Sequence, residues 1–265
     1  MQTIVDTTVF TDVLLKSDTQ RTKAKAALAA SSETLLPAYA VKEFKQGPLH
    51  SYVWFHNKVV VAGSWPEAIN AIRSNLGYRR YLPATALQAL QDFFGSIAQQ
   101  LPADITQRYP GMTVEQAQLS ELQIWLKQRI MRAWLKRRKV ATVINPLSCY
   151  VEAEIETKAS GQLDDKPTAC NVPDCCLRQR YNGNLEAVKK LQQACIGTKN
   201  EVVKRRQALD RLISHPTKPY EEKHCRALGD AVFALECPAG GEILTTNIVD
   251  HEPLAAALNL TVRAP

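Results

Sequence analysis

The sequence predicts an α/β protein, with a short parallel sheet built from both ends of the chain and a large, mostly helical insertion between them. Three observations support this fold class. Short β-branched runs alternate with helical patterns near both termini, which is typical of a parallel α/β core. The middle of the chain consists mainly of helical patterns. The 265 residues, 45% of them apolar and 22% charged, have the composition of a globular protein with a buried core.

At the N-terminus, strand and helix alternate from the start. Thr3–Val5 is a β-branched run that ends at Asp6, and Thr34–Leu36 is a second apolar run, so both are predicted strands. Pro37 follows the second run, and proline is favoured at the first position of a helix. Helices are predicted at 9–15, 21–30 and 38–44.

The middle of the chain has a different pattern. The aromatic and β-branched run at 52–62 predicts a pair of strands, and helices are predicted at 66–75 and 83–100. The clearest amphipathic helix lies within 114–140, where Lys127, Arg132 and Lys136 lie opposite an apolar stripe. That stripe consists of Leu122, Trp125, Leu126, Ile130 and Trp134.

Toward the C-terminus the alternation of strand and helix returns. Apolar and acidic residues alternate at 150–157, which predicts a half-buried strand, and 161–173 is predicted to be a loop. One or two basic helices are predicted within 184–214, with a break near Gly197. The last predicted elements are a helix at 222–237, a strand at 242–246, a helix at 253–258 and a short strand at 260–262.

Several classes of protein find no support in the sequence. No apolar run approaches the roughly 18 residues that a membrane helix needs. The first residues carry no basic stretch and reach Asp6 early, so no secretory signal is predicted and we expect a cytoplasmic protein. There is no phosphate-binding glycine loop, and no Ser-His-Asp or Cys-His arrangement stands out. Nucleotide-cofactor chemistry is therefore not expected.

Acidic and amide side chains lie near the carboxyl ends of the predicted strands. Asp6 ends the first strand, Glu43 lies on the helix after the second strand, and Asp230 lies within an apolar helix. Asn247 and Asp250 follow a later strand. Ligands of parallel α/β sheets bind beyond the carboxyl ends of the strands. Converging carboxylates at that edge form an oxygen-ligand site for Mg²⁺ or Mn²⁺, and the usual chemistry of such a site is attack of metal-activated water on a phosphodiester.

Four segments, in this order, resemble the motifs of PIN domains. They are Ile4–Phe10, Leu36–Phe44, Leu228–Ala234 and Ile243–Asp250. The resemblance covers about residues 1–50 and 220–265. It implies a three-layer α/β/α core and a metal-dependent nuclease that usually acts on RNA. It also implies that Asp6, Glu43 and Asp230 are the catalytic, metal-binding acids and that Thr7 is a polar group beside Asp6.

The segment Thr245-Thr246-Asn247 departs from the family pattern. The family often has an acid where this sequence has Asn247, and an amide oxygen can ligate a metal but brings no charge. Thr245 and Thr246 are predicted supporting groups. Two possibilities stay open: either Asp250 supplies the missing carboxylate, or one metal ion suffices.

The two matched ends are too short for a whole PIN core, so part of the adjoining sequence must complete it. We therefore assign residues 1–79 and 184–265 to a PIN-like nuclease core and residues 80–183 to a helical insertion.

The net charge of +7 arises from two basic blocks in the middle of the chain. Residues 121–139 and 178–206 each carry a net +6, and the rest of the chain carries −5. A basic face beside an acidic pocket suits a nucleic acid bound next to a metal ion, although charged helices are also ordinary solvated faces. The predicted phosphate-binding residues are Arg132, Lys136, Arg137, Arg138, Lys139, Lys204, Arg205 and Arg206. Trp65, Trp125 and Trp134 could stack on bases, but we favour a core position for a tryptophan on an apolar stripe.

Cysteine and histidine patterns are less informative. Seven cysteines, an odd number, argue against a disulfide framework. The only dense group is Cys170, Cys175 and Cys176. A structural zinc ion needs four ligands, and His224 with Cys225 makes a poor second pair because adjacent residues rarely reach one metal. We therefore favour buried thiols over zinc. His224 and His251 lie near the acids in the sequence and could assist proton transfer, but surface positions are favoured.

The leading hypothesis is a metal-dependent endonuclease with nucleic acid, RNA before DNA, as its partner. The resemblance implies a role as a toxin or as the effector of a stress or defence module, together with a regulatory protein partner. No membrane partner is expected. The alternative is a degenerate PIN fold that binds nucleic acid or protein without catalysis. Asn247 keeps this alternative open. The presence of Asp6, Glu43 and Asp230 argues against it, because clustered carboxylates repel one another and need a reason to be kept.

Overall fold

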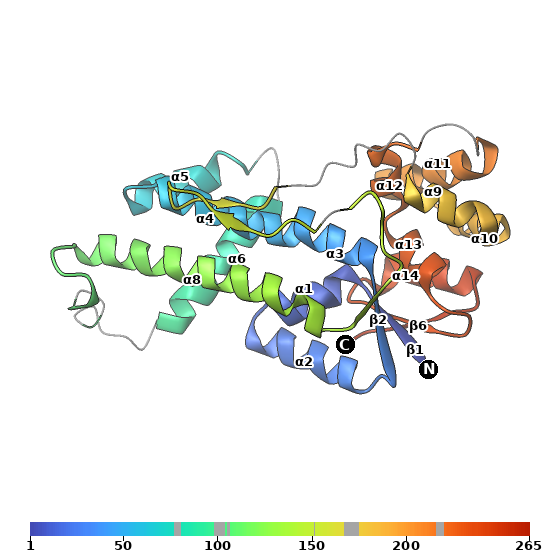
Figure 1. The fold of residues 1–265 in the computed structure, drawn as a ribbon, viewed down its shortest axis with the longest axis horizontal. Coiled ribbons are helices and arrows are strands. Elements are labelled where there is room, and N and C mark those ends of the chain that lie inside the picture. Colours follow the sequence, from blue (N-terminus) through green and yellow to red (C-terminus); the bar gives the residue numbers. More distant parts are fainter. Residues whose placement is uncertain (77–80, 98–103, 105–106, 151, 167–174, 216–219) are drawn as a thin grey trace. The chain divides into compact units, whose positions relative to one another are not determined.

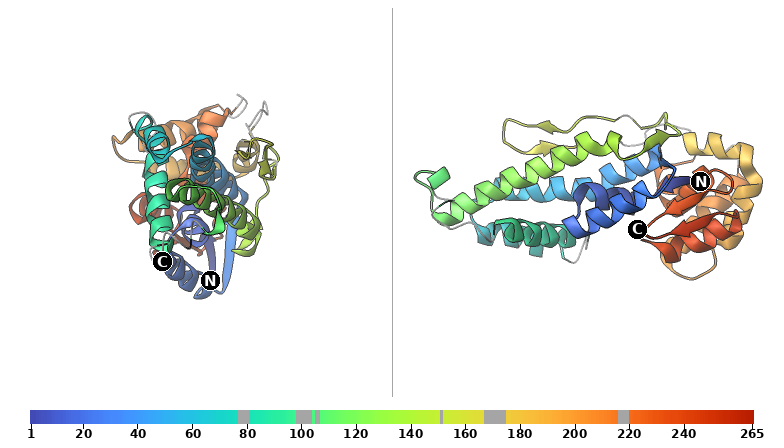
Figure 2. Two further views of the ribbon diagram at one scale, coloured as in Figure 1. Left: turned by 90° about the vertical axis from the view of Figure 1, so that its left-hand side faces the viewer. Right: turned by 90° about the horizontal axis from the view of Figure 1, so that it is seen from below.

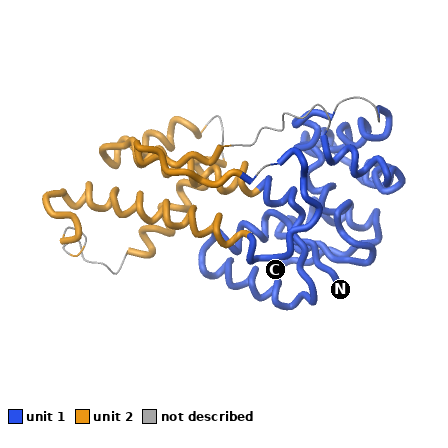
Figure 3. The backbone as a smooth tube through the Cα atoms, in the orientation of Figure 1, with its two compact units in different colours: residues 1–43, 138–152, 168–265 blue, residues 44–137, 153–167 orange. Residues whose placement is uncertain are grey.

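The computed structural model describes residues 1–76, 81–97, 104, 107–150, 152–166, 175–215 and 220–265. The chain divides into two compact units, shown in different colours in Figure 3. Unit 1 comprises residues 1–43, 138–152 and 168–265, and unit 2 comprises residues 44–137 and 153–167. The predicted core and insertion have other bounds. Residues 44–79 lie in unit 2, whereas residues 138–152 and the described part of 168–183 lie in unit 1.

Unit 1 contains a parallel five-stranded sheet, so the α/β class is confirmed. Its strands are β1 (Gln2–Val5), β2 (Glu33–Pro37), β3 (Thr142–Ile144), β6 (Glu242–Leu244) and β7 (Thr261–Arg263). Their order across the sheet is β3-β2-β1-β6-β7, and every neighbouring pair is parallel. Strand β3 was not predicted, because it is only three residues long and its first two residues are exposed at the edge of the sheet.

The helices of unit 1 lie on both faces of this sheet (Figures 1 and 2). The connection from β1 to β2 contains α1 (Thr7–Leu15) and α2 (Asp18–Ala29), and the connection from β6 to β7 contains α14 (Ile248–Ala257). These two connections run in opposite directions across the sheet, and right-handed crossovers then place their helices on opposite faces. The other helices of this unit are α3 (Ala38–Phe44, whose last residue belongs to unit 2), α9 (Cys176–Tyr181), α10 (Leu185–Ala194), α11 (Asn200–Ser214), α12 (Glu222–Leu228) and α13 (Asp230–Glu236). A single 3₁₀ turn, η3, occupies Asn182–Asn184.

The direction of the connections reverses between β1 and β6, which are neighbours in the sheet. Val5 pairs with Leu244 at the carboxyl ends of these two strands. The backbone N–H of Asp6 donates to the carbonyl of Leu244 at 3.0 Å, which holds the two chain exits together. Such a reversal is where α/β proteins bind ligands. The fold therefore places Asp6 and Thr245, the residues that follow β1 and β6, at the position where a site is expected.

Unit 2 is mainly helical. Its helices are α4 (His50–Val61), α5 (Trp65–Arg73), α6 (Tyr81–Ile97) and α8 (Val114–Lys136), with a π-helical turn η1 (Lys45–Leu49) before α4. A 3₁₀ turn, η2 (Arg137–Lys139), follows α8, and its last two residues belong to unit 1. A two-stranded antiparallel hairpin joins β4 (Glu156–Thr157) to β5 (Leu163–Asp164). Helix α8 starts at a capping box formed by Thr113 and Gln116, and Leu122, Leu126, Ile130 and Trp134 on its predicted stripe are fully buried.

Two strand predictions were wrong, and the helix predicted at 222–237 is two helices that are separated at Gly229. Residues 52–61 belong to helix α4 rather than to two strands, because Tyr52, Phe55 and Val59 recur at helical spacing and are buried on one face. Among the described residues of 150–157, only Glu156–Thr157 is a strand. The acids before it have other partners, since Glu152 pairs with Arg138 and Glu154 accepts a hydrogen bond from the indole of Trp134. The part of the predicted loop at 161–173 that the structure describes includes β5, and residues 167–173 lie outside the described residues.

The break predicted near Gly197 is confirmed, since it lies between α10 and α11. Across the parts of the chain that the structure describes, no helix combines the length and the apolarity that are needed to cross a membrane.

Candidate functional site

Asp6 is the most tightly held of the predicted acids. It is 2% exposed and forms the N-cap of α1. One carboxylate oxygen, Oδ1, accepts from the backbone N–H of Thr7 at 2.6 Å. The other oxygen, Oδ2, accepts from the hydroxyls of Thr8 and Thr245, each at 2.6 Å. Three donors from the ends of β1 and β6 thus fix one buried carboxylate, and Thr245, a predicted supporting group, is one of them.

Glu43 lies next to Asp6 through a shared neighbour. The hydroxyl of Thr7 donates to Oε2 of Glu43 at 2.7 Å, while the backbone N–H of the same residue binds Asp6. Tyr39, one helical turn earlier on α3, is near enough to the Glu43 carboxyl group to lower its pKa, and its hydroxyl donates to the carbonyl of Cys225 at 3.4 Å. Helix α3 thus places Glu43 beside Thr7, the residue that follows Asp6.

Asp230 is the first residue of α13 rather than an interior helical residue. Gly229, which separates α12 from α13, has φ of +46°, a conformation that side chains rarely adopt. The guanidinium of Arg205, on α11, donates to Oδ2 of Asp230. The side chains of this pair are only 10% and 20% exposed. Arg205 was predicted to bind phosphate at the surface, but it is buried against an acid of the site.

His251 lies between two of the acids. It is fully buried on α14, with Nε2 at 3.6 Å from Oδ2 of Asp6 and 3.5 Å from Oδ1 of Asp230. Its ring packs edge-on against Phe233, and neither ring nitrogen has a hydrogen-bond partner among the described residues. The prediction of a surface position for His251 was wrong. The residue joins the acid group, which we define as Asp6, Glu43, Asp230 and His251.

The remaining predicted ligands lie at the start of α14. The side-chain amide of Asn247 donates to Oδ2 of Asp250 at 2.8 Å, and its backbone N–H donates to the Thr245 hydroxyl at 2.9 Å. The backbone N–H of Thr246 donates to the Thr8 hydroxyl at 3.1 Å, whereas its side chain is exposed. Asp250 is near enough to raise the pKa of Asp230. These residues border the acid group through Thr8, Thr245 and Asp230.

The acids affect one another electrostatically. Burial, with the nearby charges of Asp6 and Asp230, raises the pKa of Glu43 to about 7 from its ordinary 4.5. Burial also raises the pKa of Asp230, although Arg205 and His251 oppose this effect. For Asp6, burial acts in the same direction, but His251 and the threonine hydroxyls outweigh it and the pKa is lowered. Burial thus disfavours the charged forms of Glu43 and Asp230, whereas the partners of Asp6 stabilise its charge.

This charge predicts a pH dependence of stability in EDTA. Because the pKa of Glu43 is higher in the folded protein, the folded state binds the proton more tightly. The contribution of Glu43 to the free energy of unfolding is therefore fully present below about pH 4.5, and it is lost as the pH rises through about 7. Glu43→Gln lacks this loss, so the variant should melt progressively higher than the wild type between pH 5 and pH 8. Parallel melting curves for the two proteins across this range would contradict the prediction.

The donor set of the acid group suits a hard divalent cation. Asp6, Glu43 and Asp230 present the carboxylate oxygens that Mg²⁺ and Mn²⁺ prefer, and a cation would offset the burial and the acidic neighbours that raise the pKa of Glu43. Among the residues that the structure describes, however, no three His, Cys, Asp or Glu side chains are grouped as ligands around one point. In this arrangement Arg205 and His251 are the neighbours of the Asp230 carboxylate.

The predicted phosphate-binding residues divide into exposed and buried groups. Arg132, Lys136, Arg138, Lys139, Lys204 and Arg206 are exposed. Arg138 nevertheless pairs with Glu152 at 2.9 Å. Arg137 is 3% exposed, and its guanidinium lies 3.6 Å from the ring centre of Trp134, so its cationic group is enclosed within the protein. Arg137 and Arg205 are therefore not part of a phosphate-binding surface here.

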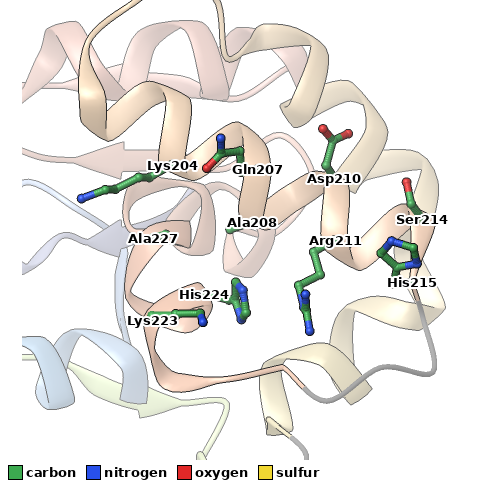
Figure 4. Close-up of a pocket in the computed structure, with 10 residues that line it drawn as sticks. All are labelled: Lys204, Gln207, Ala208, Asp210, Arg211, Ser214, His215, Lys223, His224 and Ala227. Carbon is green, nitrogen blue, oxygen red and sulfur yellow. The ribbon is translucent and has the colours of Figure 1, made fainter.

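Lys204 lines a cavity of about 650 Å³ formed by α11, α12 and His215 just beyond α11 (Figure 4). We call this space the basic cavity. Its charged and titratable lining residues are Lys204, Asp210, Arg211, His215, Lys223 and His224. Asp210 is the one acid of this lining, and Oδ1 of its carboxylate accepts a hydrogen bond from Gln192. The cavity therefore carries a positive charge, and sequence reasoning had identified only Lys204 in it.

The cysteines form a buried group of thiols in unit 1. Sγ of Cys149 lies 3.2 Å from Sγ of Cys176, and the Cys175 thiol interacts with those of Cys176 and Cys225. All described cysteines are free thiols. Nδ1 of His224 accepts from the backbone of Glu221, and its ring borders the basic cavity, so it does not join Cys225 as a ligand pair. Cys170 lies outside the described residues.

Sequence reasoning gave Thr8 no role, favoured a surface position for His251 and assigned Arg205 to phosphate binding, so it placed none of them beside the acids. The helical spacing contained a signal for the last two. Arg205 is followed at helical spacing by the buried residues Ala208, Leu209 and Leu212, and His251 is followed by Leu254 and Ala255. A polar residue that shares a face with such a stripe is directed into the protein.

Comparison of the chain with protein-family models, with curated proteins and with solved structures found no match.

Proposed function

We propose that this chain is a PIN-like, metal-dependent endonuclease that hydrolyses phosphodiester bonds, with RNA as its substrate. The observation that carries the proposal is the acid group. Asp6, Glu43 and Asp230 come from three distant parts of the sequence and converge at the reversal point between β1 and β6. Four ordered motifs resemble those of PIN domains, and a parallel sheet with helices on both faces is compatible with the α/β/α core that the resemblance implies.

The role of each side chain follows from its contacts. Asp6, Glu43 and Asp230 would hold Mg²⁺ or Mn²⁺, with Asn247 and Asp250 at the border of the site. When bound, such an ion activates water and neutralises charge on the phosphodiester. Thr8 and Thr245 orient the Asp6 carboxylate, and Thr7 orients Glu43. Because these orienting donors lie at strand and helix ends, the carboxylates are fixed before any ligand binds.

The basic cavity supports a nucleic-acid substrate. It lies on the helix that carries Arg205 and on α12, the helix directly before Asp230. Exposed lysines contribute to phosphate binding mainly through charge. We therefore propose that the nucleic-acid backbone is bound by Lys204, Arg211 and Lys223 in this cavity, with Arg206 next to it on α11.

Binding through this cavity predicts the effect of Lys204→Glu. Reversal of this charge should weaken binding of single-stranded RNA about tenfold, or about 1.4 kcal/mol, and reduce the salt dependence of binding by about 0.7 per lost phosphate contact. The measurement is fluorescence anisotropy in EDTA, where no cleavage occurs. Lys25→Glu is the control, since Lys25 is an exposed lysine of α2. Equal affinity and slope for both variants would exclude the cavity from RNA binding.

The test of the activity itself uses the full chain with labelled RNA and with DNA of the same sequence, in Mg²⁺, in Mn²⁺ and in EDTA. We expect internal cleavage of RNA that requires the metal. Cleavage of DNA alone would replace the proposed substrate, because the 2′-hydroxyl would then not be needed. Cleavage that persists in EDTA would exclude the metal-dependent mechanism.

One observation favours a second candidate function, a nucleic-acid-binding module without catalysis. Arg205 and His251 already lie against Asp230, and Asn247 is an amide where the family often has an acid. Such a site is partly neutralised without a metal ion. A chain that binds RNA but cuts neither RNA nor DNA in any divalent metal would favour this second function.

A further inference from the structure

Arg205 has an environment unlike that of the other basic residues on α11. Lys204 and Arg206 on either side of it are exposed, whereas Arg205 is 8% exposed. Its guanidinium reaches Oδ2 of Asp230, and it also lies against Gly229, where the Cβ of any other residue would lie 3.7 Å from Nη2. That distance is an ordinary van der Waals contact, so the guanidinium packs directly against the turn that precedes Asp230. The guanidinium is held on Asp230 by its position and not by random surface pairing.

Both oxygens of Asp230 have a nitrogen neighbour. Arg205 binds Oδ2, and Nε2 of His251 lies 3.5 Å from Oδ1. The same imidazole nitrogen lies 3.6 Å from Oδ2 of Asp6. Both oxygens of the carboxylate that the proposed function assigns to the metal therefore lie beside nitrogen atoms of this chain.

Removal of a cation from such a site is costly. A buried carboxylate that loses its partner is an uncompensated charge in a medium of low dielectric constant. Asp230 has other negative charges nearby, those of Asp6 and Asp250, which increase the need for a positive charge. A divalent cation at Oδ2 would lie close to the guanidinium, and the two positive charges would repel each other, so the cation competes with Arg205 for this oxygen.

We infer that Arg205 is an internal cation of the acid group, which binds Asp230 when no metal is present and must leave Oδ2 before a divalent metal ion can bind. This inference rests on the proposed function, because it presupposes a metal ion at Asp230. The Nε of Arg205 has no hydrogen-bond partner among the described residues, so the pair with Asp230 is its main polar anchor. The arginine thus sets the affinity of the site for metal.

The test is Mn²⁺ binding to the full chain, measured by calorimetry without nucleic acid. Arg205→Met keeps the length of the aliphatic side chain and removes the competing cation. In most wild-type molecules Arg205 is expected to be paired with Asp230. The apparent affinity for Mn²⁺ is then the intrinsic affinity multiplied by the fraction of molecules in which this pair is open. We expect Arg205→Met to bind Mn²⁺ at least about tenfold more tightly than the wild type, a factor that corresponds to a competent fraction of about one in ten.

Two further variants make the comparison specific. Arg226→Met removes an exposed arginine that pairs with Glu222 on α12, so it controls for the loss of an arginine–carboxylate pair elsewhere. Its Mn²⁺ affinity should equal that of the wild type. Arg205→Lys retains the charge on a shorter side chain and should give an intermediate affinity for Mn²⁺. It replaces Arg205→Met in the test if that variant fails to fold.

A second measurement follows Arg205 in the wild-type protein itself. The Nε–H signal of Arg205 in a nitrogen–proton NMR spectrum, assigned by its absence in Arg205→Lys, should shift when Mg²⁺ is added. Equal Mn²⁺ affinity in wild type, Arg205→Met and Arg205→Lys, with an unmoved signal, would overturn the inference while leaving the proposed function intact. Absence of Mn²⁺ binding in every variant, Arg205→Met included, would instead contradict the proposed function.

Discussion

Replacement of Glu43 by glutamine is expected to lower metal-dependent cleavage of RNA by about 10²–10³-fold, because a metal ligand contributes several kcal/mol to the transition state and each 1.36 kcal/mol is a factor of ten. The substitution preserves size and leaves an oxygen to accept the hydrogen bond from Thr7. It also removes a carboxyl group whose pKa is raised to about 7 by burial and by its acidic neighbours. The melting temperature at pH 8 in EDTA should therefore exceed that of the wild type.

The measurement pairs initial cleavage rates in Mn²⁺ with thermal melting of the same preparations. Glu252→Gln is the matched control, since Glu252 is an exposed glutamate of α14, next to His251 in the sequence. It should cut RNA at the wild-type rate. A folded Glu43→Gln variant with undiminished cleavage would remove Glu43 from the proposed metal site.

Asp6→Ala should have the largest effect on stability. It leaves the Thr7 amide and the hydroxyls of Thr8 and Thr245 without their acceptor and removes the N-cap of α1. Unsatisfied buried donors cost about 1–3 kcal/mol each and a lost cap about 1 kcal/mol. After relaxation we expect a loss of about 3 kcal/mol, which lowers the melting temperature by roughly 6–12 °C for a chain of this length.

Denaturant unfolding and calorimetry would measure this loss. Asp18→Ala is the control, because Asp18 begins α2 and its side chain is 96% exposed. Its loss should stay near 0.5 kcal/mol, as is usual for surface positions. Similar losses for the two variants would show that the hydrogen bonds to Asp6 do not fix the ends of β1 and β6 in the way that their geometry indicates.

Local patterns predicted the outer parts of the fold well. β1, β2, β6 and β7 are short apolar runs next to helical patterns, and this combination has few alternatives in a parallel sheet. The central run at 52–62 was misassigned because its β-branched residues favour strands, while burial of Tyr52, Phe55 and Val59 on one face favours a helix. The packing of this segment against the rest of the protein favours the helix, and such packing cannot be read from local composition.

The candidate site could be predicted only in part. Asp6, Glu43 and Asp230 follow recognisable strand and helix signals, and the structure brings them together. The partners of these acids depend on contacts between segments far apart in the sequence. Arg205 lies in a basic block that looks like a solvated helix face, and His251 follows an acid, so charge alone indicated surface positions for both. Their burial becomes apparent only from the apolar residues that follow each at helical spacing.

We propose that Asp6, Glu43 and Asp230 together bind the catalytic metal ion. Titration of the full chain with Mn²⁺, followed by electron paramagnetic resonance up to millimolar concentration, measures this binding. We expect Mn²⁺ to bind to the wild type and to Glu252→Gln with equal affinity, and at least about tenfold more weakly to Glu43→Gln, since a lost carboxylate ligand costs at least about 1.4 kcal/mol. Mn²⁺ binding that is absent from the wild type, or that is unchanged in Glu43→Gln, would contradict the claim.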